Sequence, residues 1–512
     1  MTTSKDKGSQ SIWQVISASS VGTLIEWYDF YIFGSLATII SKQFFPEDQG
    51  TAALLSTLAI FAAGFIVRPF GALVFGRLGD LIGRKYTFLL TLVLMGGSTF
   101  LIGLVPGYKV IGIAAPLLVL LLRLIQGLAL GGEYGGAATY VAEHSPAKKR
   151  GFFTSWIQTT ATLGLFLSLG VILTTRNTLG VEIFSDWGWR IPFIVSILLV
   201  IVSIYIRLRM KESPLFSKLK DEGKVSVNPL KESFGHKANL KMVLLALFGA
   251  VMGQGVVWYT GQFYAQSFIE NVCKLDFEQS RTLIIWAILF ATPFFIVFGS
   301  LSDRIGRKWI MLVGMLLGIL SYRPIYQKFL DMTSPKARTE ASRGESVVKE
   351  TPVANSTDLT RVTTTPVSYT DGSVFKEVKT EVVSADPAKA KITTAFIDKK
   401  VGGNTFWTMV FLVFIQILYV TMVYGPIAAF LVEMFPTKIR YTSMSLPYHI
   451  GNGVFGGLVP FLSTLIIEYT KTPENPAGDP LAGLWYPIGV AAVCLVIGSV
   501  YLTNKLDENV MD

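Results

Sequence analysis

The sequence has 512 residues, of which 51% are hydrophobic and only 16% are charged, and its formal net charge is +10. Soluble domains carry about 25% charged residues, so this composition excludes an ordinary soluble protein and indicates a polytopic membrane protein. The basic residues gather at the ends of apolar segments, as the positive-inside rule requires, and therefore do not indicate a nucleic-acid partner.

Sequence signals for several other classes of protein are missing. The two cysteines, Cys273 and Cys494, lie on different segments, so we expect neither a disulfide framework nor a metal site. No zinc, haem or P-loop spacing occurs, which argues against a cofactor and against an ATP-driven pump. No nucleophile can be matched with a base and an orienting group, so we expect neither catalytic residues nor an enzyme. The polar start and the long first apolar stretch argue against a cleavable signal peptide.

Twelve apolar segments are long enough to span a membrane, which takes about 20 residues each. They are residues 12–40, 52–76, 86–106, 111–143, 152–174, 189–209, 241–269, 281–300, 309–329, 405–433, 442–468 and 483–503. Connections after even-numbered segments are rich in Lys and Arg, whereas those after odd-numbered segments are poor in them. The sequence therefore predicts an all-α membrane protein with both termini in the cytoplasm.

The predicted division of the chain follows from these segments. We expect a first six-helix bundle over 1–209, a basic cytoplasmic linker over 210–240, three further helices over 241–330, an extracytoplasmic insertion over 331–403, and the last three helices over 404–512.

Two ten-residue connections, 76–85 and 299–308, are copies of each other. Their glycines allow a tight turn, and their aspartates can pair with an arginine or with a helix N-terminus. We expect both loops on the cytoplasmic side, where they change partners as the protein changes conformation. The residues that we assign to this role are Gly76, Asp80, Gly83, Arg84 and Lys85 in the first copy and Asp303, Gly306, Arg307 and Lys308 in the second.

A second repeated pattern places a glutamate, a proline and basic residues after an apolar helix. It runs from Glu143 to Arg150 and again from Glu433 to Arg440, and we assign these four residues to the same conformational role. The aspartates of the two loop copies, Asp80 and Asp303, are 223 residues apart, whereas the two glutamates, Glu143 and Glu433, are 290 residues apart. The second half therefore contains about 67 extra residues between positions 308 and 433. A repeated pattern of this kind indicates a repeated fold.

The extra residues coincide with the polar stretch from about 331 to 400, which follows the ninth helix. Its charges are mixed, and only Val374 to Val383 alternates weakly, as a strand does. We expect a solvated, partly disordered loop that contributes little to the membrane fold, with a small folded module as the alternative. Replacing 333–399 by a short linker is accordingly expected to leave a folded and active carrier.

Three motifs carry a resemblance to a known family. They are Gly22–Phe30 in the first helix, Arg123 to Gly136 in the fourth, and Glu433 to Arg440 after the tenth. In this order they resemble the metabolite:proton symporter family of the major facilitator superfamily, which includes carriers of proline and betaine, α-ketoglutarate, citrate and shikimate. The resemblance implies two six-helix bundles and an inner-membrane transporter. Leu81, where a basic residue is usual, and the insertion depart from the family pattern.

The first helix carries two carboxylates on one face, since Glu26 and Asp29 follow Gly22 at helical spacing. Charges inside a membrane helix are costly, so each needs a partner or a task. Two carboxylates on one buried face repel each other, which allows one of them to bind and release a proton near neutral pH. We expect Asp29 to couple transport to protons, with Glu26 second and Glu133 also a candidate. A static ion pair with Arg123 is the alternative.

Candidate substrate-binding residues lie on five helices. Arg123 can clamp a substrate carboxylate with two parallel hydrogen bonds, although a purely structural pairing also fits it. The aromatic and amide side chains of the seventh helix suit a small polar or quaternary ammonium ligand, with plain packing as the alternative. The full set is Tyr28, Arg123, Gln126, Tyr134, Gln254, Trp258, Tyr259, Gln262, Tyr424 and Asn452.

The predicted function is import of a small polar metabolite, an organic acid or a zwitterion such as proline or betaine, driven by protons through alternating access. The expected partners are the metabolite, the proton and the lipid bilayer, and we expect a monomer. Two alternatives stay open: a facilitator that works without protons, and a membrane sensor or receptor that binds its ligand through the insertion.

Overall fold

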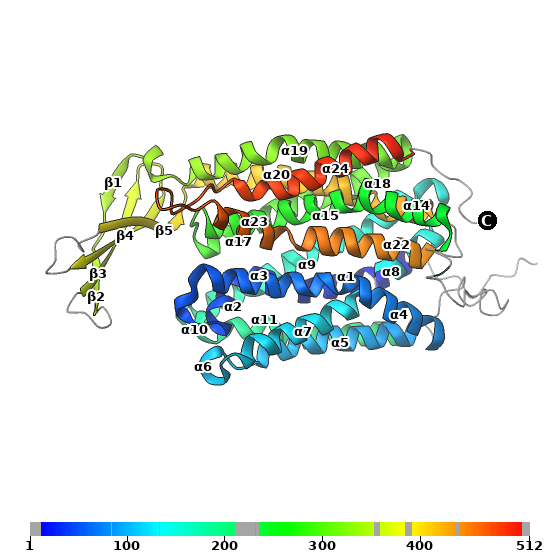
Figure 1. Ribbon diagram of the computed structural model, residues 1–512, viewed down its shortest axis with the longest axis horizontal. Coiled ribbons are helices and arrows are strands. Elements are labelled where there is room, and N and C mark those ends of the chain that lie inside the picture. The colour runs from blue at the N-terminus through cyan, green and yellow to red at the C-terminus, as the bar shows by residue number, and fades with distance from the viewer. Residues whose placement is uncertain are drawn as a thin grey trace, which may run out of the picture.

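The computed structural model describes residues 12–503, with gaps at 83, 133, 210–230, 232–234, 353–358, 384–391 and 436–439. Helices form a long body, and a small sheet projects from one of its ends (Figure 1). We call this the sheet end. The first described helix begins and the last helix ends at the opposite end, which we call the termini end.

The first half of the chain is entirely helical among its described residues. Its principal helices are α1 (Ile12–Ser35), α2 (Ala37–Phe44), α3 (Gly50–Ile66), α4 (Arg68–Ile82), α5 (Arg84–Leu104), α6 (Tyr108–Ile111), α7 (Ala114–Leu130), α8 (Tyr134–His144), α9 (Arg150–Leu179), α10 (Val181–Asp186) and α11 (Ile191–Arg209).

The helices of the second half include three π-helical turns. In chain order the elements are α14 (Lys237–Ala246), η4 (Leu247–Val251), α15 (Met252–Tyr259), η5 (Thr260–Tyr264), α16 (Ala265–Asn271), α17 (Phe277–Ala291), α18 (Pro293–Ile305), α19 (Arg307–Met332), α20 (Gly403–Tyr424), α21 (Ile427–Met434), α22 (Arg440–Tyr448), η7 (His449–Gly456), α23 (Val459–Tyr469) and α24 (Trp485–Tyr501).

These helices confirm the predicted all-α membrane fold. By length and mean hydropathy, eight described stretches qualify as membrane spans, and three shorter apolar helices and α1 complete the twelve predicted segments. Several spans consist of two helices joined at a break, as at Gly131 and Gly132, or at Thr292 before Pro293. Proline lacks the N–H that continues a helix, and neighbouring helices can satisfy the groups that such a break frees.

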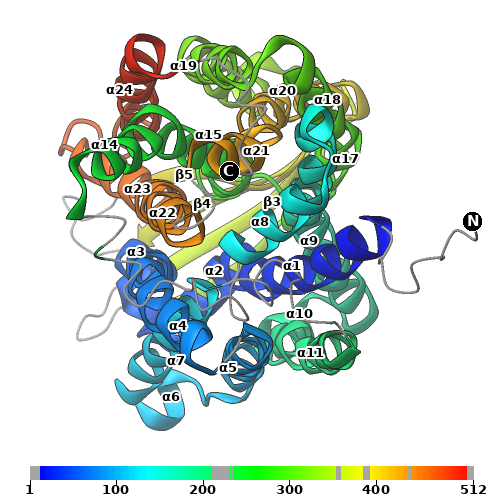
Figure 2. The same cartoon turned by 90° about the vertical axis from the view of Figure 1, so that its right-hand side faces the viewer.

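The helices form two bundles that lie side by side. Seen from the termini end, α1 to α11 form one group and α14 to α24 the other (Figure 2). Helix α9 packs against α17 and α18 across the boundary, and α3 and α4 pack against η7. The approach of α9 to α18 is so close that a Cβ atom at Gly299 would lie 2.4 Å from Cβ of Ser155, so only glycine fits there.

The two copies of the repeated sequence include the last turns of α4 and α18, and both helices end at the termini end (Figure 1). Two copies of a six-helix unit place their equivalent loops at the same end of the body, as is seen here. Gly306, which ends α18, has a φ of 90°, a conformation that only glycine adopts at little cost.

The inserted segment forms a five-stranded antiparallel sheet. Its strands are β1 (Glu340–Arg343), β2 (Val347–Pro352), β3 (Leu359–Tyr369), β4 (Val374–Val383) and β5 (Ile392–Lys400). The order is β1-β3-β4-β5, and β2 pairs with β3 beyond the end of β1. Val367, Tyr369 and Phe375 are buried and form the contact between the sheet and the helices beneath it.

The expectation of a partly disordered loop is therefore wrong for the described part of the insertion, and the alternative of a small folded module is correct. The weak alternation of Val374 to Val383 does mark a strand, β4. Few large apolar residues suffice here because the sheet does not build a core of its own. It places its buried residues where the central strands β3 and β4 join, near Phe375, and there they belong to the core of the helical body.

Candidate functional site

A layer of aromatic side chains joins the two bundles midway along the body. Trp27 and Tyr31 of α1 pack against Trp258 of α15, with ring centroids 5.3 and 5.7 Å apart. Phe263 of η5 lies 5.1 Å from the Tyr31 ring and 5.8 Å from that of Trp258. Because both bundles contribute rings, a shift of one bundle against the other must rearrange this layer.

Two charged predicted residues are buried in the first bundle. Asp29 and Arg123 are both fully buried, although they come from different helices of the first bundle. Arg123 donates a hydrogen bond to Oε1 of Gln126 at 2.5 Å, and its guanidinium lies 4.3 Å from the centre of the Phe33 ring. Gln126 in turn donates to the Thr99 hydroxyl at 2.7 Å. The predicted Arg–Gln pair of the fourth helix is therefore one connected unit.

A second buried cation, Arg68, was not among the predicted site residues. Its guanidinium lies 4.3 Å from the centre of the Phe65 ring and 5.6 Å from that of Trp27, so it borders the same layer. The sequence does carry a signal for it, since an arginine in the middle of the apolar segment 52–76 is costly without a task.

A hydrogen-bonded cluster of tyrosines and amides connects the bundles nearer the termini end. The Tyr134 and Tyr448 rings are stacked, 3.7 Å apart and nearly parallel. The hydroxyls of Tyr448 and Tyr424 are 2.7 Å apart, and Asn452 donates to the Tyr448 hydroxyl at 3.2 Å. Gln254 Nε2 lies 3.5 Å from Oδ1 of Asn452. Four predicted residues thus meet in one cluster, which we call the tyrosine cluster.

Tyr448 holds the tyrosine cluster together, although it was not among the predicted site residues. Gln158 of α9, also missed, donates to the Tyr134 hydroxyl at 2.6 Å. The missed signal for Tyr448 is its position one helical turn before Asn452, which places both side chains on one face.

The remaining predicted residues have different surroundings. Gln262 is fully buried on η5, and its side-chain amide has no hydrogen-bond partner among the described residues. Tyr259 packs edge-on against Phe65, with the ring centroids 5.1 Å apart. Tyr28 donates to the Pro192 carbonyl at 3.0 Å, a contact within the first bundle. The side chains of Glu26 and Glu133 lie outside the described residues.

At the termini end, the second loop copy holds the two bundles together. Asp303 of α18 accepts hydrogen bonds from the backbone N–H groups of Gly151 and Phe152, both at 2.8 Å. These groups belong to the first turn of α9, where a helix favours negative charge. Arg307 donates two hydrogen bonds to the Glu433 carboxylate, both at 2.6 Å, and lies 3.1 Å from Asp303.

Other predicted loop residues have their own places. Arg150 extends the network, with its guanidinium 3.9 Å from the Glu433 carboxylate. Lys308 instead donates to the carbonyls of Ser499 and Leu502, and so ties α19 to α24 within the second bundle. The side chains of 76–85, Glu143 and Arg440 lie outside the part of the chain that is described.

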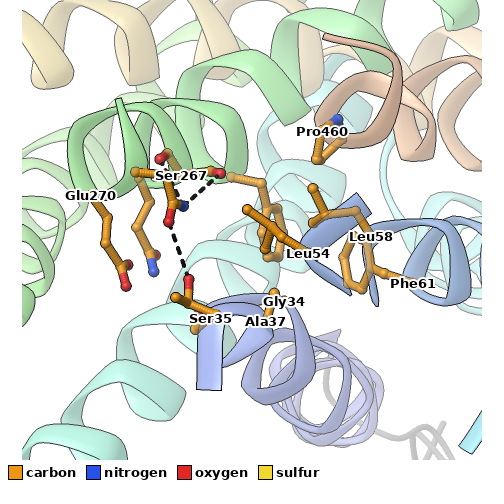
Figure 3. A pocket seen from close by; sticks show the side chains of 13 residues that line it. Gly34, Ser35, Ala37, Leu54, Leu58, Phe61, Ser267, Glu270 and Pro460 are labelled. Carbon is orange, nitrogen blue, oxygen red and sulfur yellow. Dashed lines mark hydrogen bonds between the residues drawn. The ribbon is translucent and has the colours of Figure 1, made fainter. Parts of the chain in front are cut away.

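On the sheet side of the aromatic layer, a small pocket lies between the bundles and is lined by residues of both (Figure 3). Thr38 at one wall donates to the Asn271 side chain at 3.4 Å, which links α2 to α16. Leu58 and Phe61 of α3 lie across the pocket from Glu270 of α16 (Figure 3). At the termini end, the contacts of Asp303 with α9 hold the two bundles together.

Comparisons with known proteins agree with this architecture. Residues 15–226 match the family described as "Sugar (and other) transporter". The chain is 31% identical to the inner membrane metabolite transport protein YhjE of Escherichia coli (strain K12), over 88% of this chain and 87% of that protein. It is 28% identical to the citrate-proton symporter of Klebsiella pneumoniae, over 97% and 93%.

A more similar but shorter match is the proline/betaine transporter of Escherichia coli (strain K12), 38% identical over 59% of this chain and 61% of that one. Among solved structures, a double-tryptophan mutant of XylE covers 96% of both chains with a TM-score of 0.65 and 14% identity, which shows the fold alone. The chain therefore belongs to the major facilitator superfamily, as a multi-pass inner-membrane member of its family of sugar and other metabolite transporters.

Proposed function

We propose that this metabolite transporter is a proton-coupled symporter that imports a small molecule bearing a carboxylate. The observation that carries the proposal is the full burial of Asp29 and Arg123 inside the first bundle, where Arg123 lies over the Phe61 ring that packs against Phe263 of the second bundle. A carboxylate in this position can exist with or without a proton, whereas an arginine stays charged and can hold an anion. A relative named as a citrate-proton symporter supports the proton coupling, and that relative and one named as a proline/betaine transporter support a substrate with a carboxylate.

The proposed substrates are organic acids and zwitterions such as proline or betaine. Arg123 would hold the carboxylate with its planar guanidinium. The aromatic faces of Trp27, Tyr31 and Trp258 would receive the apolar or quaternary ammonium part of the ligand. Gln262, buried and without a partner among the described residues, and Gln254 would add polar contacts from the second bundle.

The proposed orientation places both termini in the cytoplasm and the sheet outside the membrane. Lys148 and Lys149 at the start of α9 and Arg304 and Lys308 around the second loop lie at the termini end, where the positive-inside rule places basic residues. The pocket at the sheet end then faces the outside, and the contacts of Asp303 and Arg307 close the cytoplasmic side.

In the proposed cycle, a proton and the substrate enter from the sheet side. Protonation removes the charge of Asp29 and lowers the cost of enclosing it when the outer side closes. Opening of the cytoplasmic side must break the bonds of Asp303 to the backbone of α9 and the contact of Arg150 with Glu433. Substrate favours this inward-open state only to the extent that it binds this state more tightly than the outward-facing one. The proposed transporter works as a monomer.

The deciding experiment is uptake into vesicles that contain the purified protein. Labelled dicarboxylates, citrate, proline and betaine are offered with and without an inward proton gradient. We expect one of these solutes to accumulate above its outside concentration only with the gradient, and a protonophore to abolish the accumulation. Transport that equilibrates the solute and ignores the protonophore would identify a facilitator instead. Binding without flux would support a receptor.

A further inference from the structure

The inserted sheet is bonded to one particular loop of the helical body. Lys399, near the end of β5, donates its N–H to the Lys274 carbonyl at 3.0 Å and accepts from the N–H of Asp276 at 2.9 Å. Lys399 therefore forms a parallel bridge with Leu275. The loop concerned, 272–276, connects α16 to α17 at the sheet end of the second bundle.

Side chains reinforce this junction. The amide of Gln279 donates to the Val401 carbonyl and accepts from its N–H, both at 2.8 Å, so it pairs with the backbone as another strand would. Lys399 also donates from Nζ to the Thr333 carbonyl at 2.9 Å, which joins the end of the insertion to its beginning. Burial lowers the pKa of Lys399, with Arg338 and Lys274 nearby adding to the effect.

The backbone at the junction adopts a sparsely populated conformation on both sides. Lys274 has a φ of 60° and Asp398 a φ of 44°, and within the described ranges no other residue besides glycine has a positive φ. Such conformations persist where the surrounding contacts impose them, and they concentrate at functional positions. Here the contacts that impose them are those between the loop and β5.

The loop leads directly into the helix turn that touches the other bundle. Asp276 caps α17 by accepting from the N–H of Gln279 at 3.1 Å. One turn later, the fully buried Arg281 donates to the Ser35 carbonyl at the end of α1, and also to Glu270 at 2.9 Å. Arg281 thus connects α16 and α17 of the second bundle to the first bundle beside the pocket.

Two further contacts between the bundles start from the same turn of α17. Glu278 lies 3.4 Å from the Arg176 guanidinium of α9, which also lies 4.1 Å from the centre of the Phe277 ring. Phe277 packs edge-on against Phe184 of α10, with ring centroids 6.2 Å apart. The first turn of α17 therefore forms a main contact between the two bundles at the sheet end.

We propose that the inserted sheet is a brace that positions this turn and favours closure of the sheet end of the transporter. Gln279 and Lys399 are the positioning residues, and Arg281 makes the contact that they position. The inserted β-sheet, which lies outside the helical body, thereby controls how often the two bundles separate at the sheet end. The inference rests on the proposed alternating access, but its test requires neither substrate nor a proton gradient.

The test measures access to the pocket with an introduced reporter cysteine. Leu58 lines the pocket on the first bundle and is buried, so Leu58→Cys reacts with a maleimide only when the sheet side opens. The protein is purified in nanodiscs, which expose both ends to the reagent. Labelling of Cys273 and Cys494 is measured for the parent and for each variant without the reporter, and it is subtracted. Gln279→Ala removes both hydrogen bonds to Val401, and we expect it to raise the labelling rate about tenfold.

Two controls separate a brace from general loosening. Arg361→Ala removes an exposed ion pair with Glu350 within the sheet and should leave the rate unchanged. Thr139→Cys reports on the termini end, where Thr139 of α8 contacts Met444 of α22, and Gln279→Ala should not raise its labelling. Equal Leu58→Cys labelling with and without Gln279→Ala overturns the proposal. So does a rise at both reporters, or a comparable rise with Arg361→Ala.

Discussion

Asp29 and Arg123 are fully buried side chains of the first bundle, and their charges have a cost inside a membrane. Their types and helical positions could be read from the sequence because an intramembrane charge is rare and stands out. Their roles differ in a way that substitution can separate. Only the aspartate can exchange a proton at ordinary pH.

Under the proposed coupling, Asp29→Asn should keep the fold and remove the dependence of uptake on the proton gradient. Asparagine has nearly the shape of aspartate but cannot exchange a proton, so downhill exchange of substrate should persist while accumulation is lost. The comparison is uptake and exchange in the same vesicles at pH 6 and pH 8. Accumulation with unchanged pH dependence would move the coupling site to Glu26 or Glu133.

Arg123→Lys should lower substrate affinity or turnover by roughly 10- to 100-fold, because lysine keeps the charge but loses the planar fork. The loss also breaks the bond to Gln126, which positions the guanidinium. Arg361→Lys, the same exchange at an exposed ion pair of the sheet, serves as the matched control. Uptake at the parent rate in the lysine variant would reduce Arg123 to a general charge partner.

The tyrosine cluster could not be predicted from the sequence, although four of its residues were. Tyr134, Tyr424, Asn452 and Gln254 were selected separately, as polar groups on apolar helices. Their meeting point at Tyr448 depends on how α8 packs against α22, a contact between segments about 300 residues apart. Helical spacing within one segment can order residues on a face, but it carries no information about which face of a distant helix they meet.

Among the elements, the helices were predictable because about 20 apolar residues in a row have few other stable arrangements. Breaks within the spans were less visible. The π-helical turns η4, η5 and η7 leave no clear pattern in the sequence, and they form where α15 and its neighbours pack against η7. The sequence marks the copy 299–308 by its repetition, but its partner, the first turn of α9, could be identified only from the structure.

Arg307→Lys should open the termini end more often. Arg307 holds both Glu433 and the Asp303 carboxylate that binds the first turn of α9, and lysine cannot hold both carboxylates with the same planar fork, so the bond between the bundles loses stability. A Thr139→Cys reporter should then label about tenfold faster, while a Leu58→Cys reporter should not. Lys308→Arg, whose contacts to Ser499 and Leu502 do not involve Asp303, is the control. An unchanged rate at Thr139→Cys would show that this contact does not hold the termini end closed.

The turn between β3 and β4 should loosen in acid. Partial burial raises the pKa of Asp371, but hydrogen bonds from Ser373 and the Arg338 guanidinium outweigh it and hold the pKa below its ordinary value. Ionised Asp371 therefore stabilises the turn above about pH 4, and this contribution is lost as pH falls through the lowered pKa. Protection of the Ser373 amide from hydrogen exchange, compared between pH 3 and pH 6, should fall in acid. Asp371→Asn should abolish the difference.

For the whole molecule, the repeat of loops and glutamates predicted both the two-bundle architecture and the length of the insertion. What the repeat could not predict is how the insertion attaches. Its bond to the loop 272–276 joins residues about 125 apart, and the strand β5 that makes it has no distinctive pattern of its own. The insertion was therefore expected to contribute little, whereas the structure connects it to the contacts of Arg281 between the bundles.

Replacing 333–399 by a short Gly/Ser linker should separate folding from gating. The ends of the segment lie close together, since Lys399 Nζ reaches the Thr333 carbonyl, so a short linker can close the gap at little entropic cost. The apolar helices keep their own partners, so expression and thermal stability should stay near those of the parent. The loop 272–276 then loses its bonds to Lys399, and the sheet side should open more often, as with Gln279→Ala. We therefore expect Leu58→Cys labelling to rise about tenfold or more while substrate can still be exchanged.

A folded protein whose labelling rate and uptake rate equal those of the parent would show that the sheet is dispensable. A folded protein that binds no substrate would instead point to a ligand site in the sheet itself.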